Sequence, residues 1–159
     1  MDRRKALLAI LWGGLIAGAL DLTYALTFYG AQGVKPIRIP QSIASGLLGV
    51  NSFKGGFATA ALGVALQFII ALGAASFYYA ASRKLTVLTR QAVVCGLLYG
   101  GAFYFFMHWV VLPLSAAPEF KHSTVSIVSD FIAHMFFVGL SISLAVRRYS
   151  RGRTLLGKT

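Results

Sequence analysis

Four long apolar stretches dominate the chain, and each of them carries at least one polar side chain. The stretches cover residues 6–29, 57–81, 92–112 and 127–146 of a chain of 159 residues. Each is long enough to cross a bilayer as a helix, which takes about 20 apolar residues. The pattern predicts an all-α fold, a polytopic membrane four-helix bundle, in which residues 1–159 form a single transmembrane domain.

Composition and charge placement agree with a membrane protein. The chain is 57% hydrophobic and only 12% charged, which leaves too few polar residues to cover a soluble domain of this size. The formal net charge of +11 does not indicate a nucleic-acid partner, because the basic residues follow the loops. They gather before the first stretch, between the second and third, and after the fourth. Basic residues are hard to translocate, so both termini and the middle loop are predicted to be cytoplasmic. The basic C-terminal tail is expected to contact anionic membrane lipid.

The first outer loop contains a short helical pattern. Pro40 is followed by apolar residues at positions 43, 47 and 48, which repeat at helical spacing. One interpretation is a short interfacial helix lying at the outer surface of the membrane. The other is a re-entrant helix that folds over the bundle, which would require a cavity beneath it because backbone at membrane depth must be satisfied.

The polar residues inside the stretches lie on faces that pack. Asp21 shares a helical face with Gly14 and Gly18, and Gln67 shares one with small residues of the second stretch. Small residues mark the faces where membrane helices approach each other. Counted at about 1.5 Å per residue, the polar groups all fall in the outer half of the membrane. One ligand or proton site opening outward is therefore predicted, formed by Asp21, Gln67, Tyr104, His108, Asp130 and His134.

Three kinds of chemistry are open to such a site. Asp130 and His134 are spaced to hydrogen-bond each other or His108, which would only fasten helices together. An Asp–His pair could also accept a proton, because imidazole changes its charge in the physiological pH range. The third alternative is a divalent metal ion held by His108, Asp130 and His134, since imidazole with carboxylate suits zinc, ferrous iron or manganese. Haem held by His108 and His134 would need both at the same depth.

No enzyme signature occurs, because the chain has neither an H-E-x-x-H sequence nor a glycine loop for phosphate. We therefore expect no catalytic residues. Gly14-x-x-x-Gly18 and Gly96-x-x-x-Gly100 could mediate a homo-oligomer, or could serve helix packing within one chain.

The last two stretches carry a family resemblance. His108-Trp-Val-Val-Leu-Pro113, then Asp130-Phe-Ile-Ala-His134 before the basic end Arg147-Arg148, resembles the YagU-like small bacterial inner-membrane proteins. In similar proteins the position of Gln67 is often histidine, so glutamine weakens a metal ligand from the second stretch. The resemblance implies a multi-pass protein of the bacterial inner membrane and no agreed activity.

These observations lead to one functional expectation and one alternative. We expect a protein that binds or transports a proton, a metal ion or a small solute at a periplasm-facing Asp/His site. The alternative is a non-catalytic accessory membrane protein whose polar cluster only fastens helices.

Overall fold

The computed structural model of the chain describes residues 3–119 and 123–150, and this part is helical with no strands. Four helical runs are long and apolar enough to cross a membrane, which confirms the predicted fold class. The first two are α1 (Arg3–Ala31) and α3 (Gly56–Lys84). The third run joins α5 (Ala92–Phe106), η2 (Met107–Val111) and α6 (Leu112–Leu114). The fourth joins α7 (Thr124–Ala133), η3 (His134–Leu140) and α8 (Ser141–Ser150).

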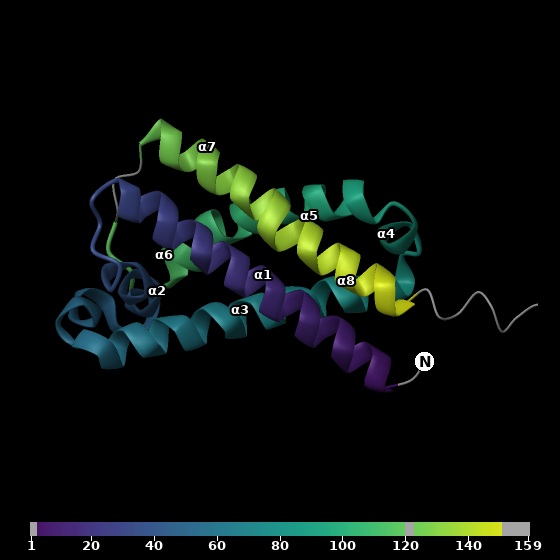
Figure 1. Ribbon diagram of the computed structural model, residues 1–159, viewed down its shortest axis with the longest axis horizontal. Helices are drawn as coiled ribbons and strands as arrows, with labels where there is room; N and C mark the ends of the chain where they lie inside the picture. The colour runs from purple at the N-terminus through teal and green to yellow at the C-terminus, as the bar shows by residue number, and fades with distance from the viewer. Residues whose placement is uncertain (1–2, 120–122, 151–159) are drawn as a thin grey trace, which may run out of the picture.

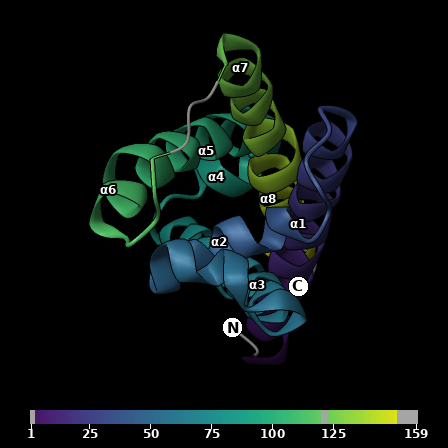
Figure 2. The same cartoon turned by 90° about the vertical axis from the view of Figure 1, so that its left-hand side faces the viewer.

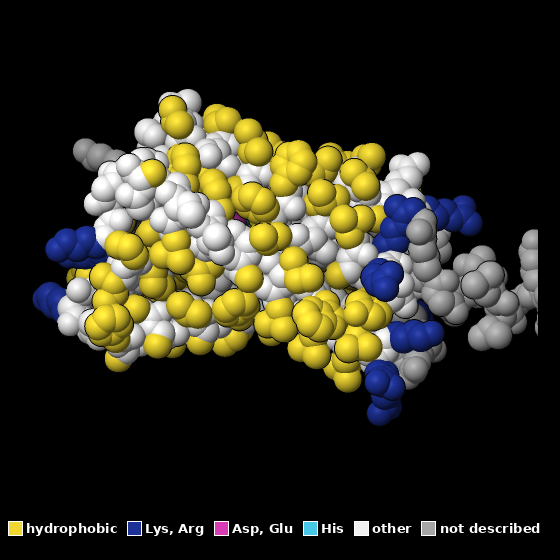
Figure 3. Space-filling model, viewed as in Figure 1, with side chains coloured by type: hydrophobic (Ala, Val, Ile, Leu, Met, Phe, Trp, Pro, Cys, Tyr) yellow, Lys and Arg dark blue, Asp and Glu magenta, His cyan; other side chains and the backbone are white. Residues whose placement is uncertain are grey.

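The molecule is elongated and has two different ends (Figure 1). The start of α1, the end of α8 and the short helix α4 (Val87–Arg90) lie together, and we call this the terminal end. The opposite end, called the loop end, carries α2 (Arg38–Leu48), η1 (Gly49–Lys54) and α6. Figure 3 shows basic side chains at both ends, more of them at the terminal end, and hydrophobic side chains over the flank between. Arg151, Arg153 and Lys158 of the predicted lipid-binding tail lie outside the described residues.

The buried hydrophobic core lies mainly in the half of the bundle near the terminal end. The buried core is formed by small and branched residues of α1, α3, η3 and α8 around Tyr78, namely Ala9, Ala17, Ala74, Ala75, Tyr78, Val138, Ile142 and Val146. Tyr99 on α5 adds an edge-to-face contact with Tyr78 and donates a 2.8 Å hydrogen bond to the carbonyl oxygen of Ala74. These contacts join α5 to α3 in this half of the bundle.

Glycines allow the long runs to approach closely within one chain. A side chain at Gly14 or Gly18 would collide with Leu72 or Phe68 on α3. A side chain at Gly100 would collide with the backbone of His134, and one at Gly96 with Ser143. Both Gly-x-x-x-Gly motifs are therefore used for packing inside the chain, which was one of the two predicted roles.

α2 packs on the side of α3 and does not lie apart from the bundle. The carbonyl of Pro40 sits where a side chain at Gly63 would be, about two helical turns after the start of α3. The buried Gln41 amide donates a 3.0 Å hydrogen bond to the carbonyl oxygen of Gly56. Ala116 N–H in the second loop donates a 2.9 Å bond to the Gly46 carbonyl oxygen. α2 is therefore folded onto the bundle, and both the interfacial and the re-entrant interpretation stay predictions, because they differ in the depth of α2 in the membrane.

Two segments of the long runs are π-helical rather than α-helical. They are η2 and η3, and His108 and His134 lie at or near the start of them. Such segments are rare and frequently occur at functional sites. A π turn widens the helix and changes the direction in which the residues of that turn point. The sequence periodicity did not predict this feature.

Candidate functional site: a carboxylate, amide and histidine cluster beside a cavity

Three helical runs meet at Asp21. The Gln67 side-chain amide on α3 donates a 2.7 Å hydrogen bond to Oδ2 of Asp21 on α1. Nδ1 of His134 on η3 lies 3.9 Å from Oδ1 of the same carboxylate. The side chains of His134 and Asp21 keep 19% and 17% of their exposure. The three groups lie 46 residues or more apart in sequence, and the fold brings them into one cluster.

A second cluster forms around Asp130 on α7. The hydroxyl of Tyr24 donates a 2.9 Å hydrogen bond to Oδ1 of Asp130, and the hydroxyl of Tyr29 donates a 2.6 Å bond to Oδ2. Both tyrosines belong to α1, so Asp130 joins the first and fourth runs. A phenol is a neutral donor, and the two bonds therefore leave the carboxylate charge uncancelled.

Both histidines use Nδ1 to hydrogen-bond their own helix. Nδ1 of His134 lies 2.9 Å from the carbonyl oxygen of Asp130, and Nδ1 of His108 lies 3.2 Å from that of Tyr104. A carbonyl only accepts, so each bond needs a proton on Nδ1. In the neutral imidazole the basic lone pair is then on Nε2. Buried Tyr104 supports both rings, with centroids 4.1 Å from His108 and 5.4 Å from His134.

A cavity of about 1440 Å³ lies beside these groups in the half of the bundle toward the loop end. Asp21, Gln67, His108, Asp130 and His134 all line it, together with Tyr24 and Tyr29. α2 contributes Ile39, Ser42, Ile43, Gly46 and Leu47, which form one helical face. Figure 2, which looks onto the loop end, shows α2 and α6 on facing sides of this region. Most of the cavity wall is apolar, and the polar groups form a small part of it.

The predicted metal site needs a correction. Among the described residues, no group of three or more His, Cys, Asp or Glu side chains could hold a metal ion, so His108, Asp130 and His134 do not form the predicted set. The physical reason is that the two side chains of the i, i+4 pair separate. The Asp130 carboxylate turns to the tyrosines of α1, whereas the His134 ring lies toward Asp21. His108 packs against Tyr104 on its own run.

Sequence reasoning did not identify the two tyrosines that hold Asp130. Tyr24 and Tyr29 belong to the aromatic residues that crowd the outer ends of the spans, which are usual in membrane proteins. A signal was present for Tyr24, since it follows Asp21 by three residues and continues the stripe of Gly14 and Gly18. Tyr29 lies five residues further along α1. Lys35 and Arg38, which line the cavity at the loop end, were also not predicted.

The fold and the site define the class of the protein as a multi-pass helical membrane protein with partly buried polar groups between its spans. Comparison of the chain with models of known families, with curated proteins and with solved structures gives no match.

Proposed function

We propose that the protein is a non-catalytic protein of the bacterial inner membrane that takes up positive charge, as a proton or a small cationic solute, at Asp21 and Asp130. The observation that carries the proposal is the meeting of Asp21, Gln67 and His134 at the wall of a large cavity. A charged group inside a membrane bundle is costly and usually marks a pathway or a binding site. The resemblance to YagU-like proteins supports the same location.

The charges around the cavity favour a cation as the bound species. Asp130 accepts hydrogen bonds from two neutral phenols, and His134 offsets the charge of Asp21 only when the imidazole is protonated. A proton, or an ammonium group that replaces it, would balance the remaining negative charge. We do not extend the proposal to a metal ion, because the described residues provide no suitable ligand group.

Orientation follows from the basic residues. Those at the terminal end outnumber those at the loop end, and they are Arg3, Arg4, Lys5, Arg83, Lys84, Arg90, Arg147 and Arg148. The proposal therefore puts the terminal end in the cytoplasm and the cavity in the periplasmic half of the membrane. Because both Gly-x-x-x-Gly motifs are used inside the chain, a homo-oligomer would need another surface.

Infrared difference spectroscopy of the protein in lipid nanodiscs tests the proposal. When the pH is lowered, we expect a carboxyl C=O band that is reduced in Asp21→Asn and again in Asp130→Asn. Glu119→Gln is the matched control, because Glu119 is an exposed carboxylate of the second loop. A band that disappears only in the control would overturn the proposal.

The alternative is a structural role for the cluster. It is favoured by one observation, which is that each oxygen of Asp130 and Oδ2 of Asp21 accepts a hydrogen bond from another helix. In that case both Asn variants would lower the melting temperature, while neither the infrared titration nor cation binding would involve these residues.

A further inference from the structure

We propose that the solute is a membrane-dissolved organic cation, an ammonium or similar group on an apolar body, which enters the cavity sideways from the bilayer. This inference rests on the proposed function and names the substrate class and the route for the same site.

The size and lining of the cavity exclude a bare ion as the group that fills it. A volume of about 1440 Å³ exceeds that of usual small-molecule sites, which is about 300–1000 Å³. The walls from α3 and the third run are apolar, with Leu66, Ile70, Phe103, Met107 and Val110 among the lining residues. An ion or a fully polar solute would leave these surfaces without a partner. An apolar body of many atoms would cover them.

The binding end of the cavity combines negative charge with aromatic faces. Asp130 lies between the hydroxyl groups of Tyr24 and Tyr29, and both tyrosines line the cavity with it. Phe103 and Phe106 add two more aromatic rings to the cavity wall. Aromatic faces attract organic cations, and this attraction grows when water is excluded. Phenol donors hold the carboxylate in place and do not neutralise it. An ammonium group is therefore the chemistry that this end of the cavity recognises.

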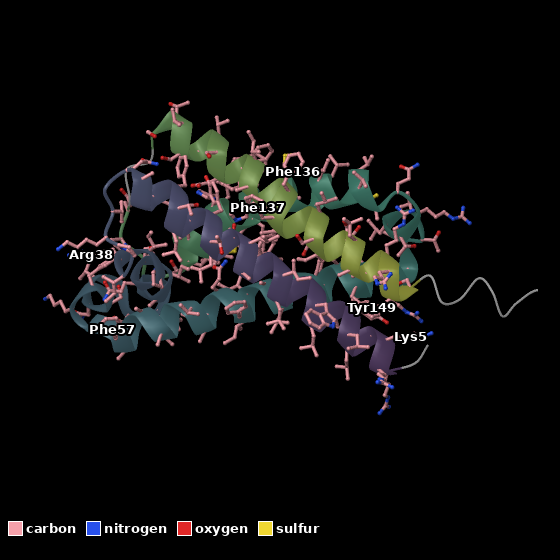
Figure 4. The ribbon with its side chains drawn as sticks, in the orientation of Figure 1. Lys5, Arg38, Phe57, Phe136, Phe137 and Tyr149 are labelled. Carbon is pink, nitrogen blue, oxygen red and sulfur yellow. The ribbon has the colours of Figure 1, made fainter. Side chains whose placement is uncertain are left out.

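The aqueous mouth of the cavity is unfavourable for a cation. Lys35 and Arg38 line it at the loop end and are exposed, and Figure 4 shows Arg38 at that end of the molecule. Arg38 lies over the Phe53 ring at 5.2 Å from its centroid. The bond between Ala116 and Gly46 also ties the two loops across this end. A soluble cation that approached here would meet like charge before it reached Asp130.

The flank offers a different route. α3 and α5 are joined near the terminal end by Tyr99, but further along the cavity wall carries exposed apolar side chains. Phe106 is 50% exposed, Val110 41% and Leu47 65%. We call these three residues the lateral opening. Phe106 and Val110 lie on α5 and η2 of the third run, which is apolar enough to span the membrane, and Leu47 lies on α2. In a bilayer the lateral opening faces lipid, where amphiphilic cations accumulate.

Binding of tetraphenylphosphonium to the protein in zwitterionic-lipid nanodiscs tests the inference, with empty nanodiscs as the blank. We expect saturable binding of tetraphenylphosphonium and weaker binding of tetramethylammonium. Tetraphenylborate, which has the same shape and the opposite charge, should show no saturable binding. Asp130→Asn should weaken tetraphenylphosphonium binding by on the order of tenfold, as expected for the loss of one charged contact. Equal binding of the cation and the anion would overturn the inference.

The route is tested by the association rate, measured by surface plasmon resonance on the same nanodiscs. Val110→Trp and Leu47→Trp fill the lateral opening from two sides and should each slow tetraphenylphosphonium association several-fold, with tetramethylammonium unaffected. Val94→Trp is the control, because Val94 is an exposed residue of α5 outside the cavity wall. Unchanged rates in both folded opening variants would overturn lateral entry.

The outcomes separate this inference from the proposed function. If tetraphenylphosphonium does not bind but the infrared band still depends on Asp21 and Asp130, the organic-cation inference is wrong and proton uptake stands. If neither signal depends on the two carboxylates, both proposals are wrong and the structural role remains.

Discussion

The side-chain amide of Gln67 donates a 2.7 Å hydrogen bond to the carboxylate of Asp21, on a different membrane span. Gln67 therefore has a role of its own and does not merely occupy the position of a histidine ligand. It is a neutral donor that satisfies one oxygen of a carboxylate inside the bundle, while His134 approaches the other oxygen. In this arrangement His134 offsets the charge of Asp21 only when its imidazole is protonated.

Replacement of Gln67 by leucine should destabilise the protein. The substitution removes the donor and leaves the Asp21 oxygen without it, which costs about 1–3 kcal/mol. The melting temperature in detergent is the measurement. Gln67→His keeps a hydrogen-bond donor, and its melting temperature should fall less than that of the leucine variant. Gln91→Leu is a control, because Gln91 is exposed near the terminal end. Equal stability of the leucine and histidine variants would argue against the hydrogen bond as the cause.

The two tyrosines on Asp130 should show coupled effects. Tyr29→Phe removes the 2.6 Å bond and Tyr24→Phe the 2.9 Å bond, and each should cost about 1 kcal/mol or more. The double variant should lose more than the sum, because the carboxylate then keeps neither phenol donor. Adding Asp130→Asn to the double variant should recover part of the loss, since it removes the charge. Thermal unfolding of the four variants measures the coupling, and simple additivity would contradict the shared role.

The docking of α2 depends on the absence of a side chain at Gly63. Gly63→Leu would collide with the Pro40 carbonyl and should displace α2 from α3. Gly73→Leu in the same helix is the matched control, because a Cβ there meets nothing within 4 Å. We expect hydrogen exchange of the α2 amides to rise in the first variant only, with the long helices still protected. Equal protection of α2 in both would show that its position does not depend on this contact.

Some of this architecture could be predicted from the sequence and some could not. The four spans follow from apolar stretches whose length matches a bilayer, and their ends were placed within a few residues. The inward faces of Asp21 and Gln67 follow from helical spacing with small residues. The π-helical turns at His108 and His134 could not be predicted in this way, because periodicity analysis assumes a regular α-helix. That assumption also led to the metal set, since it directed Asp130 and His134 toward one ion.

The two hydrogen-bond partners of Asp130 could not be predicted from the sequence for a different reason. Tyr24 and Tyr29 are aromatic residues near a span end, where membrane proteins commonly carry them whether or not they have a partner. Only the register between α1 and α7 decides that both hydroxyls reach one carboxylate. Such a register depends on tertiary packing between the first and fourth runs, as at Gly13, where an added side chain would meet Ile142 and Ala145 of α8.

Orientation in the membrane is the last quantity that decides what the cavity can bind, and single cysteines can measure it. The natural Cys95 is first replaced by alanine, and cysteine is then introduced at Lys54 on the loop end or at Arg90 on the terminal end, both exposed. If the basic terminal end is cytoplasmic, a membrane-impermeant maleimide should label Lys54→Cys in intact spheroplasts and Arg90→Cys only after permeabilisation. The opposite pattern would turn the cavity toward the cytoplasm. In that case the lateral opening would face the inner leaflet, and cations would enter the cavity from there. Lys35 and Arg38 would still repel cations at the aqueous mouth.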